Sequence, residues 1–134
     1  MIKNRFKKII IGTLLSLLVF GFAYGLFIYF VFFYPYRTSW VSFDSSEWQN
    51  GETKFDEDIR YRMHKDLLKK YKIVGMAEAD LVQLLGPESK TDKFKNWDLV
   101  YWMGPEPGAF AIDSIWLLLD IEDGKVKEFK VMTD

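Results

Sequence analysis

The side chains able to do chemistry are few in this 134-residue chain. His64 is the one histidine and cysteine is absent, so no second imidazole or thiolate can complete a metal site or a nucleophile–base pair around it. We expect His64 to be a solvated residue on a helix. The acidic run Asp56, Glu57 and Asp58 could attract Ca²⁺, but a calcium loop needs ligands that alternate over about a dozen residues around a glycine. The sequence therefore predicts no metal site.

The motifs that cradle phosphate or present an activated serine are also missing. The chain contains no G-x-x-x-x-G-K-[ST], no G-x-G-x-x-G and no G-x-S-x-G. No flanking motif singles out a pair of carboxylates for acid–base work. We therefore predict no catalytic residue and no cofactor, and a protein that is not an enzyme.

Protein binding is the function that the remaining side chains favour. The segment from Gly104 to Ser114 (GPEPGAFAIDS) is longer than a hairpin needs, and long loops often carry function. Tryptophan fills cores and also forms binding hot spots. We expect Trp116 and Trp97 to be buried, and Trp102 to be exposed if no helix covers its face of the sheet. The candidate partner-binding residues are Trp102, Pro105, Pro107 and Phe110.

Residues 9–33 form an uncharged, mostly apolar segment that determines where the rest of the chain is located. As a helix its 25 residues span about 37 Å, more than the ~30 Å hydrocarbon core of a bilayer. The preceding residues 1–8 are basic, and cationic flanks stay in the cytoplasm. We predict a cytoplasmic tail over 1–8 and an uncleaved transmembrane signal anchor over 9–33 in the cytoplasmic (inner) membrane, with the C-terminal domain extracytoplasmic. Cleavage near Ala23 is the alternative, but the apolar run continues to Phe33.

Gly21 and Gly25 form a G-x-x-x-G in this segment, a spacing that lets two membrane helices approach closely. They are the candidate residues for helix self-association, although two tolerated glycines are the simpler explanation of the pattern. The bilayer itself is an expected partner, and a homo-oligomer stays open.

The rest of the chain predicts one α+β domain. We expect a tether over 34–54 and a domain over 55–134 with two helices packed on a three-stranded antiparallel sheet, in the order α-α-β-β-β. The first helix starts near Asp58 as its cap, and its apolar stripe recurs every four residues. The second helix ends at Gly86-Pro87, and Asp123-Gly124 is a hairpin turn. The stripe is Ile59, Met63, Leu67 and Tyr71, the second helix is 78–85, and the strands are 97–103, 115–121 and 125–131. We expect the basic residues of the first helix to lie mostly on the surface: Arg60, Arg62, Lys65, Lys69 and Lys70. In the first strand the alternation places Trp97 on the same face as Leu99, Tyr101 and Met103.

These elements resemble the BamE/SmpA (OmlA)-type domain family, whose fold is compared with that of the β-lactamase inhibitor protein. The resemblance rests on RYRMHKDLL at 60–68, VGMAEADLVQLLGP at 74–87, VYWMGPE at 100–106 and DSIWLLLDIEDGKV at 113–126. It implies a small membrane-anchored envelope protein that acts through contacts, in a family known for an accessory of outer-membrane protein assembly. Two departures are the absent lipidated cysteine and Ala77 where the family caps the second helix with Ser or Thr.

Charge argues against nucleic acid as a partner. The chain carries 18 basic and 19 acidic residues; four basic residues precede the apolar segment, which leaves a net charge of −5 for residues 34–134. Nucleic-acid binding needs a basic surface. The sequence therefore predicts a noncatalytic accessory or scaffold that binds other envelope proteins; the alternative is an extracytoplasmic inhibitor-like or ligand-sensing module.

Overall fold

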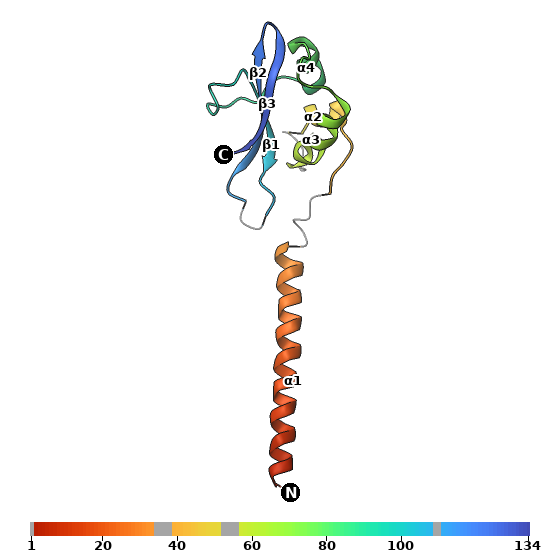
Figure 1. The fold of residues 1–134 in the computed structure, drawn as a ribbon, viewed down its shortest axis with the longest axis vertical. Coiled ribbons are helices and arrows are strands. Elements are labelled where there is room, and N and C mark those ends of the chain that lie inside the picture. The colour runs from red at the N-terminus through yellow and green to blue at the C-terminus, as the bar shows by residue number, and fades with distance from the viewer. Residues whose placement is uncertain (1, 34–38, 52–56, 109–110) are drawn as a thin grey trace. The chain divides into compact units, whose positions relative to one another are not determined.

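The computed structural model describes residues 2–33, 39–51, 57–108 and 111–134 (Figure 1). The chain divides into two compact units, Met1–Arg37 and Thr38–Asp134. The candidate residue Phe110 and the acidic residue Asp56 lie outside the described residues, as does part of the predicted tether.

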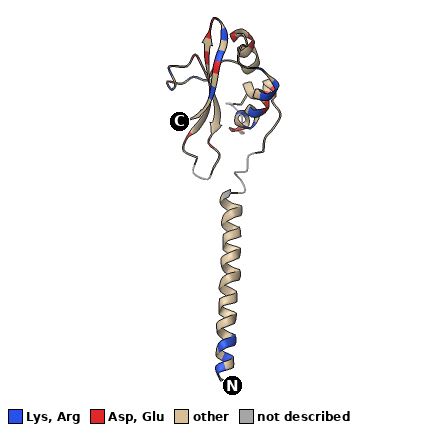
Figure 2. Cartoon of the chain, viewed as in Figure 1, with Lys and Arg blue, Asp and Glu red and all other residues tan. Residues whose placement is uncertain are grey.

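The first unit is a single long helix. α1 covers Ile2–Ile28 and continues into a π-helical segment, η1, over Tyr29–Phe33. Among the described residues, one helix is long and apolar enough to cross a membrane, over Ile2–Phe32, and none of its residues is buried. Its basic residues are confined to the N-terminal end (Figure 2). A transmembrane anchor and a signal sequence both have these properties.

The second unit has the α+β architecture predicted from the sequence, with one additional helix. α3 (Ile59–Lys70) and α4 (Glu78–Leu85) precede the strands β1 (Leu99–Pro105), β2 (Ser114–Glu122) and β3 (Lys125–Thr133). The sheet is antiparallel in the order β1-β2-β3. Figure 1 shows the helices on one side of this sheet and the segment between α4 and β1 on the other.

The additional helix is α2, over Ser45–Gln49, within the stretch predicted as a tether. The Asp44 carboxylate caps it by accepting a hydrogen bond from the Glu47 backbone N–H at 2.9 Å, as a capping residue should. Phe43 and Trp48 join the core, and Trp48 is fully buried. Residues 39–51 are therefore part of the domain.

The core lies on both faces of the sheet. The larger cluster fills the space between the helices and the sheet; its strand residues include Leu99, Tyr101 and Met103. The smaller cluster, on the opposite face, contains Val100, Trp116 and Leu118 and packs against Phe94, Trp97 and Trp102. The prediction that Trp97 is buried on the face of Leu99 is wrong, because Trp97 is half-buried and packs on the opposite face. A turn closed by the Trp97 N–H on the Phe94 carbonyl precedes β1 and carries the indole to the other face.

The β2–β3 hairpin confirms the Asp123-Gly124 turn. Glu122 pairs with Lys125 across it, and Asp123 and Gly124 have φ angles of 52° and 72°. Positive φ at both central residues is the type I′ geometry, which matches the twist of the strands. The Gly124 carbonyl also accepts a hydrogen bond from the Glu78 N–H at 2.9 Å. The hairpin thus satisfies a donor at the start of α4, where Ala77 supplies no side-chain cap.

Two expectations for α3 need correction. Asp58 is the N-cap residue, but its side chain makes no capping hydrogen bond; its carboxylate pairs with Arg62 Nε at 3.1 Å instead. Tyr71 follows the last helical residue and is 37% exposed, so it lies at the end of the buried stripe, where its ring meets Phe43 edge-on.

Candidate functional site

A groove beside β1 brings two tryptophans together with polar side chains. It has a volume of about 620 Å³, within the size range of small-molecule sites. We call it the tryptophan groove. Its lining residues are Gln49, Arg60, Pro87, Glu88, Ser89, Lys90, Trp102 and Trp116.

The two indoles come from neighbouring strands. Trp102 on β1 pairs with Trp116 on β2, so both side chains stand on the face of the sheet away from the helices. Trp116 is 8% exposed, as predicted, and packs edge-on against Phe94 at 5.7 Å between ring centroids. Trp102 is half-buried. The Trp116 Nε1–H is buried and has no hydrogen-bond partner in the described structure.

One wall of the groove is the segment that follows α4. The Ser89 N–H donates to the Val100 carbonyl, and the Ser89 Oγ accepts from the Trp102 N–H, both at 2.8 Å. These bonds extend the ladder of β1 on the side away from β2. The chain reaches this position because Gly86, with φ of 78°, and Pro87 end α4.

The floor of the groove contains Arg60, which is only 4% exposed. Its guanidinium group donates to the Trp48 carbonyl at 2.6 Å and to the Trp102 carbonyl at 3.0 Å. It also lies 5.6 Å from the centre of the Trp48 ring, within cation–π range. One side chain of α3 therefore joins α2 to the edge of β1. The expectation that Arg60 lies on the surface is wrong.

A second groove, of about 470 Å³, lies between α3 and the helix side of the sheet. We call it the α3 groove. It is lined by Tyr61, His64, Lys65, Glu106, Pro107, Ile115, Val131 and Thr133.

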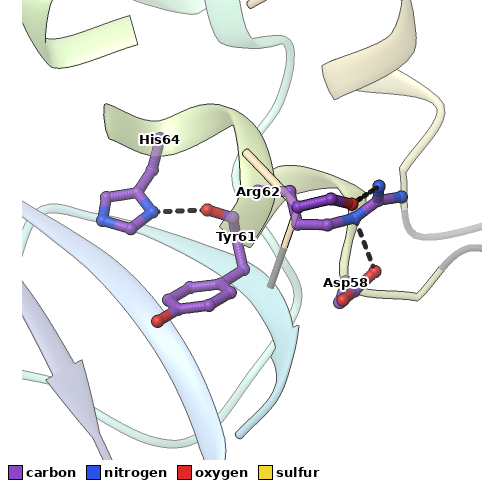
Figure 3. A network of polar contacts seen from close by, with 5 residues as sticks. Asp58, Tyr61, Arg62 and His64 are labelled. Carbon is purple, nitrogen blue, oxygen red and sulfur yellow. Dashed lines mark hydrogen bonds and ion pairs between the residues drawn. The ribbon is translucent and has the colours of Figure 1, made fainter. Parts of the chain in front are cut away.

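His64 at the α3 groove is buried, contrary to the prediction of a solvated residue, with 8% of its surface exposed. Its ring stacks on Tyr61 with 5.1 Å between centroids, and its Nδ1 donates to the Tyr61 carbonyl at 2.5 Å (Figure 3). Burial lowers the pKa of His64, with a smaller effect of the Lys65 charge in the same direction, while the bond to Tyr61 opposes them. These effects favour the neutral ring.

The partner-binding residues predicted from the sequence do not lie together in one site. Trp102 lies in the tryptophan groove and Pro107 in the α3 groove, while Pro105 is half-buried at the end of β1, opposite Ser114. Gly21 and Gly25 lie on α1, where an added Cβ would meet nothing within 4 Å. The sequence prediction missed Arg60 and Ser89, which shape the tryptophan groove.

The chemical inventory of the described residues remains sparse. They contain no group of three or more His, Asp or Glu side chains that could hold a metal ion. The pKa of the Asp120 carboxyl group is raised, chiefly because its protonated form can donate a hydrogen bond to the Asp98 carboxylate. Asp98 is exposed and also accepts from the Ile121 N–H at 2.7 Å, so this pair forms part of the β1–β2 connection.

Comparisons of the chain with models of protein families, with curated proteins and with solved structures find no match.

Proposed function

We propose that this chain is a noncatalytic, single-pass membrane protein of the bacterial envelope, whose C-terminal domain binds another envelope protein through the tryptophan groove. The observation that carries the proposal is the pairing of Trp102 with Trp116 beside the buried Arg60. Tryptophan and arginine dominate binding hot spots. Hydrogen bonds of Ser89 and Arg60 to the β1 backbone fix the position of the groove wall, so little backbone ordering is needed when a partner binds.

The membrane part of the proposal rests on the apolar helix and its flanking charge. We propose that this helix is retained as an anchor, with the N-terminus in the cytoplasm and the domain outside it, because four basic residues directly precede the apolar segment over 9–33. The BamE-type resemblance supports an accessory or scaffold role in the envelope. A reporter fused after Asp134 tests the orientation: activity confined to the cytoplasm would contradict it.

The binding role is tested by site-specific photo-cross-linking in intact cells. A cross-linking amino acid at Trp102 is expected to capture a discrete envelope protein, and Lys90→Glu on the groove rim is expected to change the yield. The matched control is the same amino acid at Trp40, an exposed tryptophan outside the groove. Equal capture from both positions, or none from Trp102 together with an unaltered envelope in a deletion strain, would refute the proposal.

A ligand-sensing or inhibitor-like module is the second candidate function. The volume of the tryptophan groove favours it, since about 620 Å³ accommodates a small molecule. Trp102 fluorescence distinguishes the two functions, because a small ligand would alter it in the purified full-length protein without any protein partner.

A further inference from the structure

The outer edges of β1 and β3 differ in how far other parts of the chain cover them. Ser89 and Arg60 occupy the outer edge of β1. At the other edge, the hairpin end of β3 is covered, because the Val126 N–H and C=O bond to Met76 and Gly75 at 2.9 and 2.8 Å. Beyond the irregularity in β3 that follows Val126, no hydrogen bond of a described residue covers the outer edge.

The direction of the uncovered backbone groups follows from two hydrogen bonds at opposite ends of β2. The Asp134 N–H donates to the Ser114 carbonyl, so residue 134 bonds inward, toward β2. The Leu119 carbonyl accepts from Asp98 on the β1 side, so Leu119 does not bond to its partner Phe129. Hydrogen-bonding residues alternate along an antiparallel strand. The N–H and C=O groups of Phe129, Val131 and Thr133 therefore point away from the sheet.

These outward groups are evenly spaced about Val131, so an antiparallel second copy of β3 can satisfy all of them at once. We propose that two copies of the chain pair through antiparallel β3 strands, in the register that places Val131 opposite Val131 of the second copy. Phe129 of each copy then lies opposite Thr133 of the other, and all the outward groups of residues 129–133 find partners. The exposed Val131 side chain, at the rim of the α3 groove, is covered in the same step.

Neighbouring registers fit less well. A register centred on Lys130 would bring Asp134 of the second copy opposite Val126, whose outward groups are already bonded to Gly75 and Met76. A register centred on Met132 would leave the outward groups of Phe129 without a partner strand. A register centred on Phe129 would bring residues 132 and 133 of the second copy against the segment at Gly75 and Met76 that already covers Val126. Confinement to one membrane, as in the proposed function, would raise the effective concentration of the copies. The strand pairing itself does not depend on that function.

The register makes a sharp cross-linking test possible, because the chain has no native cysteine. Hydrogen-bonded pairs have Cα atoms about 5.5 Å apart, within disulfide range. With the full chain in its native membrane under mild oxidation, Val131→Cys is expected to give at least about tenfold more covalent dimer than the control Val74→Cys, also exposed. Phe129→Cys and Thr133→Cys are each expected to cross-link poorly alone, and well when the two variants are co-expressed.

A proline substitution tests the outer edge of β3 without removing a hydrogen bond to β2. The Val131 N–H points outward, so Val131→Pro removes a donor to the second copy and no bond to β2. Added to the co-expressed Phe129→Cys and Thr133→Cys pair, it is expected to reduce cross-linking about tenfold while the circular dichroism spectrum stays unchanged.

Three outcomes would overturn the proposal. The first is equal cross-linking at positions 131 and 74, as expected for random collision or for a dimer held only through α1. The second is efficient cross-linking of Phe129→Cys or Thr133→Cys with itself, which requires another register. The third is a proline variant that keeps its fold and cross-links as well as its parent.

Discussion

Replacing Arg60 with methionine tests whether this buried side chain holds the helices to the sheet. The substitution keeps a long, flexible side chain but removes the donors to the Trp48 and Trp102 carbonyls at 2.6 and 3.0 Å. A hydrogen bond that involves a charged group contributes about 1.5–3 kcal/mol, so loss of the two bonds predicts a decrease of about 3–6 kcal/mol in the free energy of unfolding. Against a typical total of about 5–15 kcal/mol, this is a large fraction.

Arg62→Met is the matched control, because it removes an arginine two residues away on the same helix. Arg62 is partly exposed and pairs with Asp58, and such surface pairs are worth about 0–1 kcal/mol. The assay is urea unfolding of the full-length protein in detergent, followed by tryptophan fluorescence and circular dichroism. Equal losses for the two variants, or a loss below about 1 kcal/mol for Arg60→Met, would refute the reasoning.

Three further predictions concern titration and backbone geometry. The pKa of His64 is lowered in the folded state. Its contribution to stability is therefore complete above about pH 6.5 and is lost as the pH falls toward the folded-state pKa. His64→Gln should flatten this pH dependence of the free energy of unfolding, measured by urea unfolding between pH 7.5 and 5.5. Burial raises the pKa of Tyr101 to about 12, so its absorbance should titrate well above pH 10, and the stability of the domain should fall as the pH rises from 10 to 12. Tyr101→Phe should remove that fall. At neutral pH the variant should lose about 1 kcal/mol of stability, because the hydrogen bond to the Gly86 carbonyl is absent. Gly104→Ala should lower the melting temperature far more than Gly75→Ala: both have positive φ, but only at Gly104 would the new Cβ meet backbone, 2.5 Å from the Glu57 carbonyl oxygen.

The elements that sequence reasoning predicted are those with local signals. The helix over 78–85 has a Gly-Pro stop, the hairpin has Asp123-Gly124, and the strands alternate, so each element is specified by neighbouring residues. The missed helix α2 also had a local signal, since Asp44 and Glu47 have capping-box spacing. It was hidden because five residues are too few to show a period of 3.6.

The errors concern side chains whose environment depends on distant parts of the chain. At 100° per residue, Arg60 falls between Leu67 and Tyr71 on the helical wheel, at one edge of the apolar stripe, so the periodicity alone is compatible with its burial. Its charge favoured the surface, and its burial is favourable because the guanidinium group donates to the carbonyls of Trp48, Gln49 and Trp102, up to 42 residues away. His64 lies at the margin of the same stripe, and Trp40 and Tyr61 complete its enclosure. The tryptophan groove likewise needs the tertiary position of Ser89.

The type I′ turn at Asp123-Gly124 has a consequence for the order in which the domain folds. A hairpin with a two-residue loop closes in about 1–10 μs, whereas the contacts of Arg60 join segments that are distant in the sequence and must wait for larger loops to close. The hairpin is therefore expected to be formed in the folding transition state and the Arg60 contacts to be absent from it. Changes at Arg60 should then accelerate unfolding and leave the folding rate nearly constant. The arginine that shapes the tryptophan groove would thus set the lifetime of the folded domain.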